Sequence, residues 1–142
     1  MELPLKIIVA DETQTKKLAK EFSGILKPGD VISLIGDLGT GKTFFVKNIV
    51  AMFGQSNSSS PTFAIVNVYE GKYKVNHFDF YRIKKLGELY DIGFDDYLND
   101  DEAITFIEWA DMFEEILPKN RFEVTIDFID ITKREITISK LS

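Results

Sequence analysis

The segment GDLGTGKT, at residues 36–43 of this 142-residue chain, constrains the fold more than any other part of the sequence. It directly follows the apolar run VISLI (31–35) and leads into KTFFVKNIVAMF (42–53), whose apolar residues recur at helical spacing. Three glycines within eight residues disfavour both a helix and a strand. A glycine-rich loop between a buried strand and an amphipathic helix indicates a backbone that wraps closely around an anion.

This loop fits the phosphate-binding pattern G-x-x-x-x-G-K-[ST], with Gly36, Gly41, Lys42 and Thr43 at its fixed positions. Glycines permit the positive φ angles and the close backbone approach that let successive N–H groups point at one anion. The Lys42 ammonium is expected near the β- and γ-phosphates, and the Thr43 hydroxyl on Mg²⁺. A chance match in an ordinary glycine turn is the alternative, but the flanking strand and helix are the context that the motif requires.

We therefore expect the loop and the residue after it to bind the phosphates of a nucleotide. The expected contacts are Asp37, Leu38, Gly39, Thr40, Gly41, Lys42, Thr43 and Phe44. Phe44 and Phe45 are expected to be core residues, with Phe44 close to the expected position of an adenine. The guanine-reading signature N-K-x-D is absent from the sequence, which favours ATP over GTP.

Two acidic residues are well placed to complete a magnesium site, which needs oxygen ligands. Glu108 ends the buried run AITFI (103–107), and a parallel strand delivers such a side chain to the ligand-binding edge of its sheet. Asp79 lies at the end of a predicted hairpin strand. For both residues a solvated surface acid is the alternative. With Lys42 they are the predicted catalytic residues, and whether Asp79 or Glu108 orients the attacking water stays open.

Two other residues beside these acids are less informative. His77, the only histidine, lies two residues before Asp79 on a predicted strand, and we expect it to be structural or hydrogen-bonded rather than catalytic. Trp109, the only tryptophan, is either a core residue or an exposed recognition aromatic. The polar segment GQSNSSS (54–60) is either a connector or a switch that orders around a ligand.

The remaining patterns predict a single α/β domain over residues 1–142. Its fold class is a P-loop NTPase-like mixed sheet flanked by helices, with antiparallel hairpins added to a parallel core. Helices are expected from Asp11 or Thr13 onward, with Leu18, Phe22, Ile25 and Leu26 on one face, at 42–53 with Phe45, Ile49 and Met52 on one face, and as short pieces at 88–98 broken at Gly93. Strands are expected at 5–9, 31–35 and 103–107, and in hairpins at 63–70 with 73–80 and at 122–128 with 135–139.

Composition limits the classes of partner. The formal net charge of −6 weighs against independent binding of nucleic acid, which needs basic residues to displace counterions. No apolar run approaches the roughly 20 residues of a transmembrane helix, so no membrane partner is expected. Without cysteine, disulfides and thiolate metal sites are excluded. A cytoplasmic protein is the simplest expectation.

Several segments together resemble one family, the bacterial tRNA threonylcarbamoyladenosine biosynthesis ATPases (TsaE, formerly YjeE). They are GDLGTGKTFFVKNI, SPTFAIVNVYEG, HFDFYRI, ELYDIGFDDYL and ITFIEWAD, in that order, and the resemblance runs from about residue 11 to about residue 138. It implies a small P-loop ATPase that partners a TsaB–TsaD heterodimer, which holds the tRNA. This system installs threonylcarbamoyladenosine in tRNAs that read codons beginning with A, and ATP hydrolysis resets the complex between turnovers.

The resemblance also assigns roles to residues. Thr43 and Glu108 would hold Mg²⁺, and Asp79 would contact the nucleotide or the attacking water. Thr62 would sense the γ-phosphate, and Glu12 and Lys133 would lie at the outer edge of the nucleotide.

With Arg82 as the only candidate for an arginine finger within the chain, we expect activity to be weak alone and stimulated by partners. The alternatives are a P-loop kinase of small molecules, which the chain's three arginines support poorly, and an interaction module that binds ATP without hydrolysing it.

Overall fold

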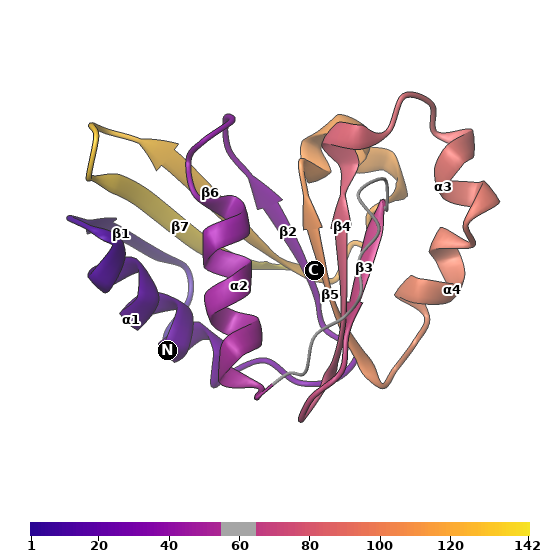
Figure 1. Ribbon diagram of the computed structural model, residues 1–142, viewed down its shortest axis with the longest axis horizontal. Helices are drawn as coiled ribbons and strands as arrows, with labels where there is room; N and C mark the ends of the chain where they lie inside the picture. Colours follow the sequence, from indigo (N-terminus) through magenta and orange to yellow (C-terminus); the bar gives the residue numbers. More distant parts are fainter. Residues whose placement is uncertain (55–64) are drawn as a thin grey trace.

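A computed structural model describes residues 1–54 and 65–142, which form a seven-stranded mixed sheet with helices on both faces (Figure 1). The strands are β1 (Leu5–Val9), β2 (Val31–Ile35), β3 (Val66–Tyr69), β4 (Lys74–Asp79), β5 (Ala103–Glu108), β6 (Arg121–Phe128) and β7 (Arg134–Leu141), in the order β1-β7-β6-β2-β5-β4-β3. β2 pairs in parallel with β5 and β6, and β4 pairs in parallel with β5. Strands β3 and β7 add antiparallel hairpins on either side, and β1 pairs antiparallel with β7. The predicted mixed sheet with a parallel core is confirmed.

Side-chain alternation along the strands divides the core between the two faces of the sheet. On β2, Ile32 and Leu34 point to the face covered by α1 (Glu12–Ser23) and α2 (Lys42–Met52), whereas Val31 points to the opposite face. That opposite face is covered by α3 (Gly87–Asp91), α4 (Phe94–Leu98) and the 3-10 segments η1 (Phe80–Arg82) and η2 (Ala110–Ile116). Both faces of β2 and β5 are thus covered, which explains why these strands are mainly apolar and buried along their length.

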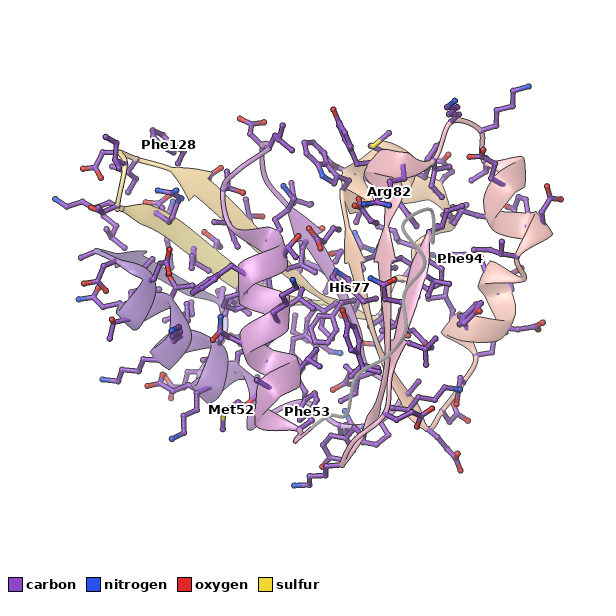
Figure 2. All side chains as sticks on the ribbon, viewed as in Figure 1. Met52, Phe53, His77, Arg82, Phe94 and Phe128 are labelled. Atoms are coloured by element: carbon purple, nitrogen blue, oxygen red, sulfur yellow. The ribbon has the colours of Figure 1, made fainter. Side chains whose placement is uncertain are left out.

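Phenylalanines fill both halves of this core. Phe22 of α1 meets Phe122 of β6 edge to face, with ring centroids 5.5 Å apart, beneath the α1–α2 pair. On the other face, Phe78 packs edge to face on Phe94, with ring centroids 5.0 Å apart; Phe94 is labelled in Figure 2. Each such buried ring contributes about 1.5–3 kcal/mol by its removal from water, so the two faces are stabilised by separate aromatic clusters.

The helix termini agree with the predictions in part. Asp11 is the N-cap of α1, its Oδ1 accepting the Gln14 N–H at 3.0 Å, whereas Thr13 lies within the helix. The helix ends at Ser23, so Ile25 and Leu26 belong to the turn that follows it. Leu26 is still buried in the core, whereas Ile25 is only partly buried.

The prediction that Met52 packs with Phe45 and Ile49 on α2 is wrong, because Met52 is 46% exposed. Successive helical residues turn by about 100°, and the buried stripe of α2 is centred on Val46 and Ile49 and continues into Phe53, which leaves Met52 at its margin (Figure 2). The two helical pieces at 88–98 are confirmed as α3 and α4, with Gly93 between them at φ 76°.

The parallel pairing places the carboxyl ends of β2, β4, β5 and β6 at one edge of the sheet, at the top of Figure 1. Asp79 and Glu108 end their strands there, β2 leads into the glycine loop, and β6 leads into the turn before β7. Ligands of open α/β sheets bind at this edge. Within residues 1–54 and 65–142, no helix has both the length and the apolar character needed to cross a bilayer.

Candidate active site

The glycine loop between β2 and α2 depends on glycine at two positions for different reasons. A Cβ on Gly36 would lie 2.5 Å from the carbonyl oxygen of Ile126, so only glycine lets the loop pass this close to β6. Gly41 has φ 107°, in the region that other residues rarely adopt, and its carbonyl accepts the Phe45 N–H at 2.9 Å in the first turn of α2. The loop is therefore held tightly against the sheet and opens directly onto the positive end of a helix.

Lys42 is turned back onto this loop. Its side chain is buried, and Nζ donates hydrogen bonds to the carbonyl oxygens of Gly36 (2.5 Å) and Asp37 (2.9 Å). The same ammonium lies 4.1 Å from the ring centroid of Trp109, a cation–π contact. Burial lowers the pKa of Lys42, although the nearby carboxylates, first among them Glu108, act in the opposite direction.

Glu108 is the most tightly held acid of the site. The Thr43 hydroxyl donates to its two carboxylate oxygens at 2.8 and 2.9 Å, and Nε2 of His77 lies 2.5 Å from Oε2. Glu108 and His77 are both buried. Burial alone would raise the pKa of Glu108, but the hydrogen bond and charge of His77, together with the Thr43 hydroxyl, outweigh it and hold this pKa below its ordinary value.

Asp79 pairs in register with Glu108 across β4 and β5 but has a different environment. Its Oδ1 accepts the Tyr81 N–H at 3.1 Å, and Nε of Arg82 lies 3.6 Å from its Oδ2. Burial raises the pKa of Asp79, and the neighbouring charge of Glu108 adds to this shift. Two adjacent carboxyl groups thus have pKa values displaced in opposite directions.

The donor atoms at this point fit a magnesium ion. The Thr43 hydroxyl and the Glu108 carboxylate are hard oxygen ligands already within contact of each other. In the part of the chain that the structure describes, no group of three or more His, Asp or Glu side chains is arranged to hold a metal ion. A magnesium ion bound here would take only part of its ligands from the protein, as is usual for Mg²⁺ that bridges to phosphates and keeps several waters.

Two clefts meet at the glycine loop. The smaller, of about 270 Å³, contains most of the residues predicted for phosphate and metal: Leu38, Gly39, Gly41, Lys42, Thr43, Phe44, Asp79 and Glu108, with Tyr81 and Trp109 beside them. The larger, of about 480 Å³, lies between α1, the loop and the β6–β7 turn. Of the predicted residues it contains Glu12, Gly39, Thr40, Gly41 and Phe44. Gly39, Gly41 and Phe44 line both clefts, so one elongated ligand can occupy them together.

Two predicted residues lie apart from the cleft walls. Asp37 lines neither of the two clefts, and its backbone carbonyl accepts a hydrogen bond from Nζ of Lys42. Lys133 is exposed on the turn between Thr132 and Arg134, both of which line the larger cleft. Thr62 lies outside the described residues, as do residues 55–60 of the predicted connector or switch.

The structure also brings in residues whose role the sequence did not indicate. His77 is hydrogen-bonded, as expected, and its partner is Glu108. The sequence indicated a place for His77 at the site only through its two-residue spacing from Asp79, which puts both side chains on one face of β4. Phe45 is fully buried as expected, whereas Phe44 lines the clefts. Trp109 is partly buried, and its left-handed backbone (φ 58°) turns its ring over Lys42.

Comparisons with known proteins point to one family. A family model described as threonylcarbamoyl adenosine biosynthesis protein TsaE matches residues 9–136. Proteins named tRNA threonylcarbamoyladenosine biosynthesis protein TsaE include one from Rickettsia felis, 38% identical over 90% of this chain and 75% of its own length. Those from Bacillus subtilis and Aquifex aeolicus are each 37% identical, over 95% and 97% of this chain and 85% and 98% of their own lengths.

A solved structure is similar over the whole fold. The crystal structure of YdiB from Bacillus subtilis superposes with a TM-score of 0.79 at 31% identity, covering 100% of this chain and 88% of that one. Because the family model spans most of the sequence and relatives above 30% identity cover it almost end to end, the chain belongs to the TsaE family of threonylcarbamoyladenosine biosynthesis proteins.

Proposed function

We propose that this protein is a magnesium-dependent ATPase that serves the threonylcarbamoyladenosine modification of tRNAs reading codons that begin with A. One observation carries the proposal: the Thr43 hydroxyl meets the Glu108 carboxylate at 2.8 Å, directly beside Lys42 and the phosphate-type loop. A glycine loop alone binds many anions. A hydroxyl and a buried carboxylate that meet at its end are what a nucleotide with a bound metal requires.

The loop and Lys42 are assigned to the phosphates. Backbone N–H groups of residues 39–43 and the positive end of α2 would bind the polyphosphate, and the Lys42 ammonium would leave the Gly36 and Asp37 carbonyls for the β- and γ-phosphate oxygens. A magnesium ion held by Thr43 and Glu108 would neutralise charge that develops on the transferred phosphoryl group. The residues of the loop act chiefly by positioning and electrostatics, which dominate phosphoryl transfer.

The opposite pKa displacements favour a division of labour between the two acids. Glu108, with its lowered pKa, stays ionised and suits a metal ligand. Asp79, with its raised pKa and its contact with the smaller cleft, suits the group that orients the attacking water and accepts its proton. We therefore assign water orientation to Asp79, which pairs in register with Glu108 across the adjacent strands.

The nucleoside is assigned to the larger cleft. It continues from the phosphate loop past Phe44 and has apolar walls in Ile126, Ile131 and Ile136, which suit a flat base. Glu12 at the start of α1 also lines this cleft, where it would contact the ribose or base. Lys133 would lie at the outer edge from its exposed position on the turn.

The proposed partners are a TsaB–TsaD heterodimer and, through it, tRNA, in the cytoplasm. A net charge of −6 is unsuited to direct tRNA binding but suits a subunit that acts through a protein complex. ATP hydrolysis would reset that complex between turnovers. Of the three arginines, all of which lie in the described ranges, only Arg82, beside Asp79, is near the smaller cleft, so turnover is expected to be slow alone and faster with partners.

Two other functions are less well supported. A P-loop kinase clamps the transferred phosphate with several lid arginines. Here the Arg121 guanidinium is held by Pro118 and Ser33 at the opposite edge of the sheet, and Arg134 binds backbone carbonyls. A module that binds ATP without hydrolysis would not need the adjacent Asp79, with its raised pKa.

Phosphate release, measured for the protein alone and with the TsaB–TsaD pair and tRNA, tests the proposal. Lys42→Ala should abolish release, whereas Lys47→Ala, an exposed lysine on the same helix, should leave it unchanged. Asp79→Asn should slow turnover at unchanged ATP affinity, and Glu108→Gln should raise the magnesium concentration required. Unchanged turnover in Lys42→Ala would refute the site, and a phosphorylated metabolite in step with ATP consumption would favour a kinase.

A further inference from the structure

A single arginine connects two walls of the larger cleft. Arg134, the first residue of β7, donates from Nε to the carbonyl oxygen of Thr40 in the phosphate loop at 3.0 Å. Its Nη1 donates to carbonyl oxygens of the β6–β7 turn, those of Asp130 (2.7 Å), Lys133 (3.0 Å) and, more weakly, Ile131 (3.4 Å). One guanidinium thus binds the loop and the turn together.

The guanidinium is also fixed from the other side. Its central carbon lies 4.9 Å from the ring centroid of Phe128, the last residue of β6 (Figure 2). This cation–π contact limits the rotation of an arginine whose guanidinium already donates hydrogen bonds to backbone carbonyls. Phe128 is itself 60% exposed, so this contact lies at the surface of the protein rather than in its core.

The turn has its own internal order, so Arg134 positions it as a unit. Asp130 Oδ1 accepts the N–H groups of Thr132 (2.9 Å) and Lys133 (2.8 Å), and Ile129 N–H binds the Lys133 carbonyl at 3.1 Å. Among the hydrogen bonds of the described residues, those that join this turn to the glycine loop come from one side chain, Arg134.

The residues that Arg134 joins face each other across the cleft. Thr40 and Gly41 line the side of the phosphate loop, and Ile131 and Thr132 line the side of the turn. Ile131 is 88% exposed and has little packing of its own to hold it there. The width of the cleft consequently depends on how firmly Arg134 holds the turn against the loop.

We propose that Arg134 is a positioning residue. It fixes the β6–β7 turn, one wall of the larger cleft, relative to the glycine loop, so that the base and the polyphosphate are bound by one rigid unit. This inference rests on the proposed nucleotide site. It predicts that Arg134 governs the preference for a nucleoside triphosphate over a bare polyphosphate, because only the nucleoside needs the turn. Phosphate binding by the loop and turnover of bound ATP depend on it much less.

The test compares two ligands on two matched variants. Binding of ATP and of inorganic tripolyphosphate, each with Mg²⁺, is measured by calorimetry on wild type and Arg134→Lys, which keeps the positive charge but loses the fork. Arg121→Lys is the control, because Arg121 is held by a similar set of bonds to Pro118 and Ser33 at the far edge of the sheet. Thermal unfolding of both variants shows whether their losses of stability are comparable.

Arg134→Lys is expected to weaken ATP binding by about tenfold or more, the loss of one charge-assisted hydrogen bond, and tripolyphosphate binding by less than about twofold. The KM for ATP should rise by a similar factor while kcat changes little, and Arg121→Lys should alter none of these quantities. If Arg134→Lys does not fold, Phe128→Leu should shift the same ratio in the same direction by a smaller factor.

Equal weakening of both ligands, or an unchanged ATP affinity, would overturn the role of Arg134 while leaving the proposed function intact. A wild-type protein that binds no ATP would instead refute the proposed function and this inference with it.

Discussion

The buried contact between His77 and Glu108 predicts a specific loss of stability. In His77→Asn the side-chain amide ends near the position of Nδ1, so it cannot reach the Glu108 carboxylate that Nε2 contacts at 2.5 Å. A hydrogen bond to a charged group contributes about 1.5–3 kcal/mol. Because the Thr43 hydroxyl still binds Glu108, we expect a loss within this range, about 2–3 kcal/mol.

The free energy of unfolding from urea titrations, extrapolated to water, measures this loss. His77→Gln is the matched variant, since its longer side chain carries an N–H donor to about the position of Nε2, and it should recover at least half of the loss. A double-mutant cycle with Glu108→Gln isolates the pair and should give a coupling energy of about 1.5 kcal/mol or more. A coupling near zero, or equal losses in the Asn and Gln variants, would show that His77 acts by filling space and would refute the reasoning.

Three further predictions concern the same edge of the sheet. Because burial raises the pKa of Asp79, its ionised form destabilises the fold at neutral pH, and this effect disappears below the ordinary carboxyl pKa of about 4. Asp79→Asn, which keeps an acceptor for the Tyr81 amide, should raise the unfolding temperature by roughly 1–3 °C near neutral pH and leave it unchanged in acid; the same shift at both pH values would contradict this. Trp109 is the only tryptophan, and its ring centroid lies 4.1 Å from the Lys42 ammonium. Its fluorescence should therefore change when ATP draws Lys42 to the phosphates, and a titration with tripolyphosphate should give the same change. A fluorescence change that persists in Lys42→Met would argue against this origin. Gly36→Ala should destabilise the protein by about 1–3 kcal/mol in urea titrations and reduce phosphate binding, because its Cβ would clash with a β6 carbonyl at 2.5 Å, whereas Gly87→Ala, where no atom lies near, should be close to neutral.

Much of the fold could be predicted because its signals are local. The loop at residues 36–43, the mainly apolar runs of β2 and β5, and the alternating sequences of β6 and β7 each indicate their own element without knowledge of the others. The prediction for Met52 was wrong for a related reason: helical spacing gives a stripe, but the partner surface decides which edge of that stripe is buried.

Only those parts of the candidate site that lie close together in the sequence could be predicted from it. Lys42 and Thr43 follow from one motif, whereas the contact of Thr43 with Glu108 joins residues 65 positions apart and depends on β5 lying beside β2. The strand order that creates this neighbourhood follows from packing of the whole sheet. Arg134 illustrates the same limit, since its contact with Thr40 spans 94 positions and no local pattern marks it.

Register explains why His77, Asp79 and Glu108 form one group. Asp79 pairs with Glu108, and His77 pairs with Phe106, two residues before it, so both side chains of β4 project on the face from which Glu108 projects. A shift of the β4–β5 pairing by one residue would turn the side chain of His77 to the other face of the sheet, into the core cluster that contains Phe78. Among the described residues, Thr43 would then be the remaining side-chain hydrogen-bond partner of Glu108. Without His77, burial would be opposed only by the Thr43 hydroxyl and the Lys42 charge, so the pKa of Glu108 would rise from its present lowered position. The ionisation that the proposed magnesium site needs is thus a consequence of strand register as much as of residue identity.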